Sequence, residues 1–296
     1  MPKIKTILVT GKNGQLGCTL KSLESQHPQY QFTFTGREEL DLSCSQSIVT
    51  FFENNRFDVV INCAAYTAVD KAEEQQELAD AINHLAVKQL AEIAQKNGSI
   101  FIHISTDYVF DGESYKPYVE NDLINPQNIY GSTKLKGEQA IQDIMKGAVI
   151  IRTSWVYSEY GNNFVKTMLR LGRERDQLNV IFDQIGSPTY AKDLALSILA
   201  IIDSISDNLT DFQKEVTSVY HFSNEGVCSW YDFAKAIFEL SDIQCAVSPI
   251  ETKDYPTPAK RPHYSVLNKA TIKQSYPVNI PYWKDSLSEC LNKLQK

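Results

Sequence analysis

The chain has 296 residues, of which 43% are hydrophobic and 22% are charged, and its formal net charge is -7 at pH 7. This is the composition of an ordinary globular protein, long enough to form one large α/β unit or two lobes. The negative charge, without any run rich in Lys and Arg, argues against a nucleic-acid-binding surface. No stretch approaches the ~20 apolar residues that span a bilayer, so we expect no membrane partner.

The spacing of the cysteines and the amino-terminal residues indicate in which compartment the protein is expected. The six cysteines are scattered, with no Cys-x-x-Cys pair and no metal-ligand spacing to the five histidines. We therefore expect reduced cysteines that mostly pack in the interior of a cytoplasmic protein, and no metal site. The first residues have too short an apolar run for a signal peptide and lead straight into a strand.

The first predicted strand, Lys5 to Thr10, leads into a glycine-rich turn, Gly11-Lys-Asn-Gly14-Gln-Leu-Gly17, and then into a helix. Glycines at such a turn let the backbone approach a phosphate, and the free N-H groups and dipole of the helix attract the anion. The spacing differs from the standard G-x-G-x-x-G fingerprint, and a plain tight turn is the alternative. The place of the turn directly after the first strand favours a dinucleotide site.

The second strand, Gln31 to Thr35, should end beside the adenosine ribose of such a dinucleotide. An acidic residue that selects NAD is expected near this point, but Gly36 and Arg37 occur there instead. Arg37 could pair with a 2'-phosphate, which favours NADPH, although a surface arginine is equally plausible. Asp41 is a candidate acceptor for the adenine amine, or a cap for the helix that begins near Ser45.

The third strand, Phe57 to Asn62, ends in Cys63-Ala-Ala-Tyr66, where small residues would let a flat cofactor lie on the backbone. A long helix is predicted from Ala72 to Lys96 and ends at Asn97-Gly98. We interpret Asn83 and His84, both within it, as structural.

The fourth strand, Ile100 to Ile104, is almost continuously apolar, as expected for a strand covered on both faces. We interpret His103 as a core residue. The strand leads to Ser105 and Thr106 at the ligand edge of the sheet. The Thr106 hydroxyl is our candidate to polarise a substrate carbonyl, with Ser105 turned to the backbone.

Tyr130 and Lys134 lie near the start of a helix that follows Pro126, and their i, i+4 spacing places them on one face. A nearby ammonium lowers the pKa of a phenol, so Tyr130 could exchange a proton with an alcohol or alkoxide at neutral pH. The same spacing recurs at Tyr231 and Lys235, in a helix that Ser229 should cap, where we interpret it as structural. Only the first copy follows an apolar strand that ends in Ser105-Thr106, in a chain that begins with a glycine-rich turn, and we therefore assign the chemistry to it.

The fifth strand, Ala148 to Thr153, precedes Trp155, which offers an apolar face to a sugar or base but could equally be a core residue. Lys260 and Arg261 follow a proline-rich stretch and could bind a diphosphate, although a solvated loop is the simpler interpretation. The remaining predicted elements are a helix from 162 to 173, a strand at 178–182, an ordered loop at 183–189, a helix at 190–202, a strand at 219–222 and a closing helix at 283–294.

Taken together, these motifs resemble the extended short-chain dehydrogenase/reductases, and within them the family that reduces dTDP-linked 4-keto sugars. The more specific stretches are Ser105-Thr-Asp-Tyr-Val-Phe-Asp-Gly112 and Arg152-Thr-Ser-Trp155. The others include Leu40-Asp-Leu42, Asn62 to Lys71, Tyr130 to Glu138, Asn162-Asn-Phe164, Gly186-Ser-Pro-Thr189 and Arg261-Pro262. Together they cover nearly the whole chain.

The resemblance implies a role for each matching residue. Tyr130 would be the proton donor, Lys134 would hold the nicotinamide ribose, and Thr106 would assist at the carbonyl. Asp107 and Trp155 would contact the substrate, as Arg261 could. The resemblance also implies that Gly14, Gln15, Leu16, Ala64, Ala65 and Tyr66 surround the cofactor. To these cofactor-binding residues we add Gly11, Gly17, Arg37, Asp41, Leu42, Tyr130 and Lys134, and Thr106 is also expected to bind the substrate. Family members use NADPH, NADH or both, and some carry Mg2+ at a homodimer interface, but no ligand set for a metal is evident here.

We therefore predict an α/β protein with a Rossmann-type, doubly wound parallel sheet in residues 1–154 and a smaller, mostly carboxyl-terminal substrate lobe in residues 155–296. Residues from about 190 to 222 should return to the first domain, and the site should lie in the cleft. The predicted reaction is hydride transfer from NADPH to the C4 ketone of dTDP-4-dehydro-L-rhamnose. The alternatives are another nucleotide-sugar reductase or epimerase, and a non-catalytic NADP-binding regulatory subunit, which intact Thr106, Tyr130 and Lys134 disfavour.

Overall fold

A parallel sheet forms the centre of the computed structural model, which describes residues 4–207, 212–213 and 215–295. Among these residues, six strands pair in the order β10-β5-β4-β3-β1-β2, and every pair is parallel. The strands are β1 (Thr6–Thr10), β2 (Gln31–Thr35), β3 (Val59–Asn62), β4 (Ile100–Thr106), β5 (Ala148–Thr153) and β10 (Ser218–Phe222). The predicted parallel, doubly wound sheet is confirmed.

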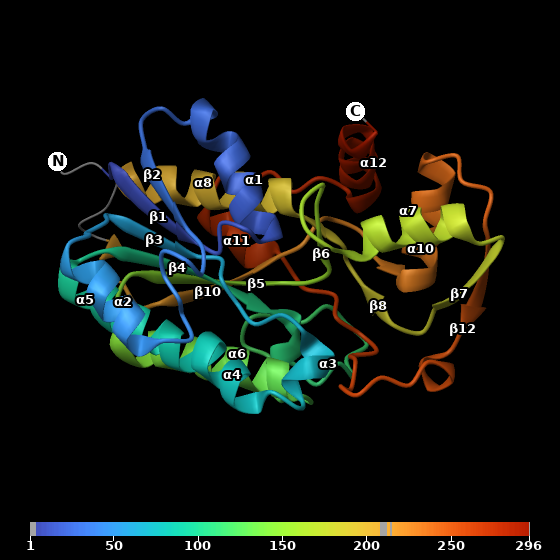
Figure 1. Ribbon diagram of the computed structural model, residues 1–296, viewed down its shortest axis with the longest axis horizontal. Helices are drawn as coiled ribbons and strands as arrows, with labels where there is room; N and C mark the ends of the chain where they lie inside the picture. Colours follow the sequence, from blue (N-terminus) through green and yellow to red (C-terminus); the bar gives the residue numbers. More distant parts are fainter. Residues whose placement is uncertain (1–3, 208–211, 214, 296) are drawn as a thin grey trace.

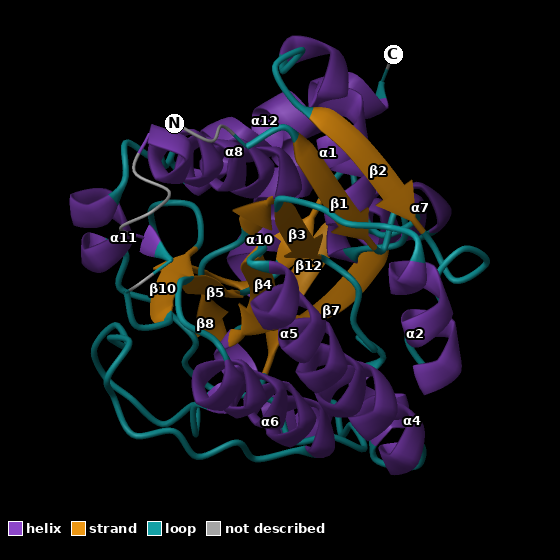
Figure 2. Ribbon diagram, turned by 90° about the vertical axis from the view of Figure 1, so that its left-hand side faces the viewer, coloured by secondary structure: helices purple, strands orange, loops and turns teal. Residues whose placement is uncertain are grey.

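Helices cover both faces of this sheet. One face carries α1 (Gln15–Leu23), α8 (Ala191–Asp207) and α11 (Ala270–Ser275), and the other carries α2 (Ser45–Glu53), α5 (Ala86–Asn97) and α6 (Ile129–Ile144). Figure 1 shows the two layers above and below the strands, and Figure 2 shows the same sandwich from one end. Among the described residues, no helix combines the length and the apolar character that crossing a membrane requires.

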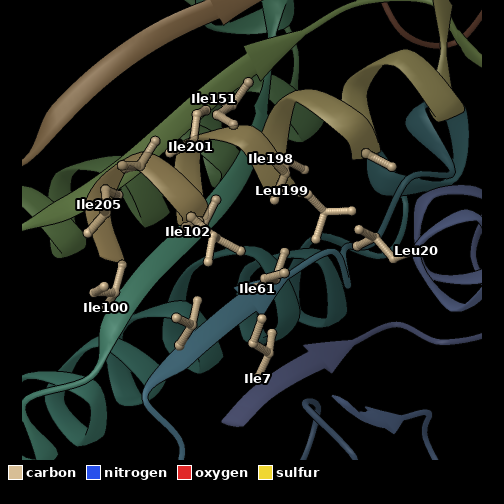
Figure 3. Close-up of a cluster of buried hydrophobic side chains, with 14 of the residues drawn as sticks. Ile7, Leu20, Ile61, Ile100, Ile102, Ile151, Ile198, Leu199, Ile201 and Ile205 are labelled. Carbon is tan, nitrogen blue, oxygen red and sulfur yellow. The ribbon is translucent and has the colours of Figure 1, made fainter. Parts of the chain in front are cut away.

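The first core has two layers, one on each face of the sheet, because side chains alternate along each strand. Ile7, Ile61 and Ile102 pack against α1 and α8, where Ile198 and Leu199 complete the cluster in Figure 3. The intervening residues point the other way: Leu8, Val60, Phe101 and Ile150 pack with residues of α2, α5 and α6. Strands buried on both faces must be apolar at nearly every position, which explains the continuous runs in the sequence.

The predicted helix from Ala72 to Lys96 is helical from Gln76 onwards, but it is broken at residues 73–75 and contains a π-helical turn. The chain instead forms α3 (Val69–Ala72), α4 (Gln76–Asp80), a π-helical turn (Ala81–Leu85) and α5, which ends as predicted at Gly98 with a left-handed φ of 69°. The π-helical turn carries Asn83, whose side chain accepts from the backbone N-H of Tyr66 (2.8 Å) and donates to its carbonyl (3.1 Å). Periodicity cannot reveal such a turn, because it adds a single residue to an otherwise regular helix.

A second core lies beyond the carboxyl end of the sheet. It is built by α7 (Phe164–Glu174), α10 (Trp230–Leu240), α12 (Trp283–Leu294) and the parallel pair β7 (Gln177–Ile181) with β12 (Ala246–Ile250). Short pairs join β6 (Val156–Tyr157) to β9 (Thr189–Tyr190) and β8 (Ile185–Gly186) to β11 (Cys228–Ser229). Single 3-10 turns occupy Glu24–Gln26, Asp107–Val109 and Thr252–Asp254.

The later part of the chain contributes to both cores. Helix α8 packs on the central sheet and β10 pairs with β5, whereas α7, α10 and α12 pack around the second core. On these contacts we propose to keep the domain division at residue 154, with residues from about 190 to 222 assigned to the first domain. Of that returning segment, residues 208–211 and 214 lie outside the described part of the chain, as do residues 1–3 of the first domain.

Candidate active site

The glycine turn between β1 and α1 places backbone where side chains would not fit. Gly11 has a φ of 73°, and a Cβ atom on Gly17 would lie 2.2 Å from the Gly11 carbonyl oxygen. Helix α1 begins after Gly14, which supplies no side-chain cap, so the helix start can offer N-H groups to an anion. These features fit the pyrophosphate of a dinucleotide. Of the other predicted residues here, Leu16 is buried in the core.

Gln15 joins this turn to the second lobe. Its amide nitrogen donates to the Val156 carbonyl (3.1 Å), and its amide oxygen accepts from Ser158 (3.0 Å) and Asn163 (2.9 Å). Asn163 also caps α7, because its side chain accepts from the Lys166 N-H. The Gln15 side chain therefore positions one lobe against the other, a role that its motif alone did not indicate.

The end of β2 carries two cations. Arg37 is exposed and pairs with Asp41 (Nε to Oδ2, 3.2 Å). Lys12, which sequence reasoning missed, packs against Gly36 and pairs with Glu39. The structure therefore brings both cations to the end of β2, each paired with a carboxylate.

Asp41 binds its own loop, since its Oδ1 accepts from the Ser43 N-H (2.9 Å) and hydroxyl (2.6 Å). Helix α2 begins after Cys44, without a side-chain cap, so the alternative role of Asp41 as a helix cap is not observed. Leu42 is buried in the core on that face.

The carboxyl end of β3 adjoins the glycine turn. A Cβ atom on Gly11 would lie 2.9 Å from the Ala64 backbone nitrogen, so the two backbone segments are in close contact. Ala64, Ala65 and Tyr66 are half-buried. The Tyr66 hydroxyl donates to Gln75 (2.9 Å), and its backbone is held by Asn83. Asn83 was interpreted as merely structural, but it fixes this predicted cofactor-binding segment.

Helix α6 carries Tyr130 and Lys134. It begins after Asn128, whose side chain accepts from the Gly131 N-H at 2.8 Å. The Tyr130 ring packs edge-on against Tyr108, with 5.4 Å between ring centroids. Thr106 lies close enough to Tyr130 for its hydroxyl to lower the pKa of the phenol, so these two predicted catalytic residues are together.

The pKa of Tyr130 was expected to be lowered by Lys134, but the structure shows that it is raised. Burial raises the pKa of Tyr130, the charge of Asp107 adds to this, and Lys134 is not among the causes. The Lys134 Nζ atom instead donates to the Ile104 carbonyl at 2.6 Å and lies 3.1 Å from His103 Nε2. Tyr130 therefore keeps its proton at neutral pH. Burial also lowers the pKa of Lys134 to about 8, against the opposing charge of Glu138.

Thr106 and Asp107 end the fourth strand and are each 4% exposed. The Thr106 hydroxyl donates to Asp107 Oδ1 (2.9 Å) and accepts from the Tyr108 N-H (3.2 Å). Burial raises the pKa of Asp107 to about 7. Ser105 was expected to turn to the backbone, but it donates instead to the buried carboxylate of Glu138.

A cavity of about 980 Å³ lies mostly along the second core; Tyr108, the ring neighbour of Tyr130, lines it, whereas Thr106, Asp107 and Tyr130 do not. Trp155 lines it and stacks on Trp230, with ring centroids 3.6 Å apart, so Trp155 is not simply a core residue. Arg261 also lines it and binds Asp70 (2.6 Å) and the Tyr108 hydroxyl (3.1 Å). Trp155, Arg261 and Tyr108 therefore line the same cavity, and the Tyr108 ring in turn packs against Tyr130.

Two other patterns lie outside this site. The second Tyr-x-x-x-Lys copy is in α10, which begins with a capping box between Ser229 and Asp232, as expected of a structural helix. Within residues 4–207, 212–213 and 215–295, no three His, Cys, Asp or Glu side chains gather to hold a metal ion.

Comparisons with known proteins agree over almost the whole chain. A family model described as the RmlD substrate binding domain matches residues 5–296. A relative from Sinorhizobium fredii named dTDP-4-dehydrorhamnose reductase is 40% identical over 284 residues, which cover 95% of this chain and 94% of the relative.

Two solved structures of proteins with the same name superpose closely. That from Clostridium acetobutylicum is 43% identical, with a TM-score of 0.90, and covers 98% of this chain and 100% of that chain. That from Bacillus anthracis, in complex with NADP, is 37% identical, with a TM-score of 0.90, and covers 98% and 99%.

Proposed function

We propose, from the premise that this chain belongs to the dTDP-4-dehydrorhamnose reductase family, that it uses NADPH to reduce the C4 ketone of dTDP-4-dehydro-β-L-rhamnose to dTDP-L-rhamnose. The observation that carries the proposal is the convergence on β4 of Tyr130, close to Thr106, and Lys134, bound to the Ile104 carbonyl, with a large cavity that reaches Tyr108. A module that only binds a dinucleotide would not need a buried proton donor.

The cofactor fits the residues that surround its proposed site. The start of α1, with Gly14, Gln15, Leu16 and Gly17, offers backbone N-H groups to the pyrophosphate. Arg37 and Lys12 bind the 2'-phosphate, with Asp41 and Leu42 beside the adenine, and Ala64, Ala65 and Tyr66 line the path to the nicotinamide. When bound, NADPH supplies the hydride.

The chemistry at the ketone is assigned to three side chains. Tyr130 gives its proton to the oxygen that becomes the C4 hydroxyl, and its raised pKa keeps that proton available at neutral pH. The Lys134 ammonium, fixed by the Ile104 carbonyl and His103, holds the nicotinamide ribose. The Thr106 hydroxyl, which donates to Asp107 here, turns to donate to the carbonyl oxygen and polarises it.

The rest of the substrate occupies the cavity. Trp155, supported by its stack on Trp230, offers an apolar face to the sugar. Asp107 accepts a hydrogen bond from a sugar hydroxyl. Arg261, already fixed by Asp70, provides positive charge for the diphosphate.

A panel of sugars and nicotinamide cofactors tests this proposal. Loss of NADPH absorbance is followed with dTDP-4-dehydro-L-rhamnose, with its UDP counterpart and with NADH in place of NADPH. Rapid oxidation confined to the dTDP sugar supports the proposal. Reduction of the UDP sugar alone indicates another nucleotide-sugar reductase. Binding of NADPH without any oxidation supports the non-catalytic regulatory subunit.

The compartment and the assembly are proposals of the same kind. All six cysteines are free, which fits the reducing cytoplasm that we propose as the location. The proposed homodimer rests on the family resemblance, and light scattering coupled to size-exclusion chromatography measures its mass directly.

A further inference from the structure

A chain of buried polar side chains runs beneath the proposed site. Thr10, Asn62 and His103 stand directly opposite one another on the adjacent strands β1, β3 and β4, on the face that α6 covers. Thr10 Oγ1 lies 2.7 Å from Asn62 Oδ1, the Asn62 amide lies 3.0 Å from His103 Nδ1, and His103 Nε2 lies 3.1 Å from Lys134 Nζ. His103 is fully buried, so its two ring nitrogens depend on these partners.

The proton positions follow from what each group can donate. A lysine ammonium has three N-H donors and no acceptor, so His103 Nε2 must face it with a lone pair. The imidazole proton is then on Nδ1, which must donate to an oxygen. Exchanging the amide oxygen and nitrogen of Asn62, which are nearly identical in shape, provides that oxygen. The opposite imidazole tautomer would place an N-H group against the Lys134 ammonium.

Two of the three Lys134 donors are therefore used inside the protein. One goes to the Ile104 carbonyl (2.6 Å) and one to His103 Nε2, which leaves a single N-H for a ligand. Two fixed acceptors define the direction of the third donor, because the ammonium is tetrahedral. A flexible lysine, 1% exposed, is thereby held in one orientation.

We propose that His103 is a positioning residue for the reduction, whose neutral imidazole orients the Lys134 ammonium toward the nicotinamide ribose and keeps it protonated. The proposal deepens the function proposed above and rests on it for the identity of the reaction. It also assigns a role to Asn62 and Thr10: Asn62 holds the Nδ1 side of the imidazole, and Thr10 holds Asn62.

The charges around Lys134 agree with this division of protons. The groups that face it are His103 from β4, Cys63 from the end of β3 and Glu138 from α6, with Arg152 of β5 paired to Glu138. Burial and the Lys134 charge hold the pKa of His103 well below its usual value, and burial raises the pKa values of Cys63 and Tyr130. The pKa of Lys134 itself is lowered to about 8, so Lys134 is the group in this cluster that should titrate just above neutral pH.

Two variants of similar polarity separate the two ring nitrogens. His103→Gln can place an amide oxygen near the Nε2 position and so keep an acceptor for Lys134. His103→Asn reaches only the Nδ1 position and keeps the contact with Asn62. For each variant, the NADPH dissociation constant and kcat are measured from about pH 6 to about pH 10.

The wild-type protein should lose NADPH affinity and kcat above about pH 8, as Lys134 loses its proton. In His103→Asn this limb should move down by about one to two pH units, the size expected for one lost hydrogen bond to a charged group. His103→Gln should stay within about half a unit of wild type. An unchanged limb in His103→Asn, or equal shifts in both variants, would overturn the proposal.

Folding and function are separated by the choice of readouts. Circular dichroism and thermal melting show whether each variant folds, and His103→Phe, which keeps a ring beside Phe101, replaces His103→Asn if that variant does not fold. NADPH binding needs no sugar substrate. The predicted shift in binding without reduction of any sugar would therefore uphold the role of His103 and refute the proposed reaction alone.

Discussion

Removing Arg152 should destabilise the protein strongly, because it would leave a buried carboxylate without its partner. Arg152 Nη2 lies 2.7 Å and Nε 3.0 Å from the Glu138 carboxylate, and the two side chains are 2% and 1% exposed. Arg152 also donates to the Glu120 carbonyl (3.2 Å) and lies over the Phe110 ring (5.1 Å). Breaking such a pair typically costs about 3–5 kcal/mol.

We therefore expect Arg152→Met to lose about 4 kcal/mol of unfolding free energy at pH 7, a large part of the roughly 5–15 kcal/mol typical of a domain. Glu138→Gln alone should lose about 3 kcal/mol, because the guanidinium then lacks its counter-charge. The double variant should lose far less than the sum, with a coupling of about 3 kcal/mol, since neither charge remains unpaired.

Urea unfolding followed by tryptophan fluorescence measures all four proteins of this cycle. Additive losses in the double variant would show that the two side chains do not depend on each other, and would refute this explanation of how α6 is fixed against β4 and β5.

Two further perturbations probe the cofactor turn and the response to acid. Gly17→Ala should weaken NADPH binding at least about tenfold in a fluorescence titration, because its Cβ would lie 2.2 Å from the Gly11 carbonyl. Gly98→Ala is the matched control: it has a φ of 69° with open space around it, so it should lose about 1 kcal/mol of stability but bind NADPH normally. Unchanged binding in Gly17→Ala would contradict the close approach. Burial and the Arg152 charge lower the pKa of His221 from 6.5 to about 3, so the unfolded chain takes up this proton first and stability falls as pH drops below about 6.5. Between pH 7 and pH 5, His221→Phe should lose about 2 kcal/mol less than wild type, and equal losses in urea titrations would count against a neutral buried His221.

Local patterns predicted the parts of the structure that depend on neighbouring residues. The bounds of β2, β5 and α12 match the predictions, because alternation, apolar runs and helical periodicity are properties of short segments. The spacing of Tyr130 and Lys134 placed both on α6. Strand β12 was not predicted, because its half-buried residues show no strong pattern and its partner β7 is distant in the chain.

The chemistry of the site depends on contacts between distant segments, which periodicity does not encode. Asp70 and Arg261 meet although 191 positions separate them. His103 was interpreted as a core residue, and it is buried, but only its contact with Lys134 on α6 reveals a partner. The pKa of Tyr130 was predicted in the wrong direction because burial raises it, while Lys134, which was expected to lower it, is bound to the Ile104 carbonyl.

Turnover of Tyr130→Phe with NADPH and dTDP-4-dehydro-L-rhamnose tests most directly whether this phenol is the proton donor. The variant lacks only the hydroxyl, and its ring can keep the packing against Tyr108. We expect kcat to fall about 100-fold or more. NADPH affinity should stay within about twofold of wild type, since the phosphate and ribose contacts come from other residues. Near-normal turnover in a folded Tyr130→Phe protein would contradict the assignment of Tyr130 and the mechanism built on it.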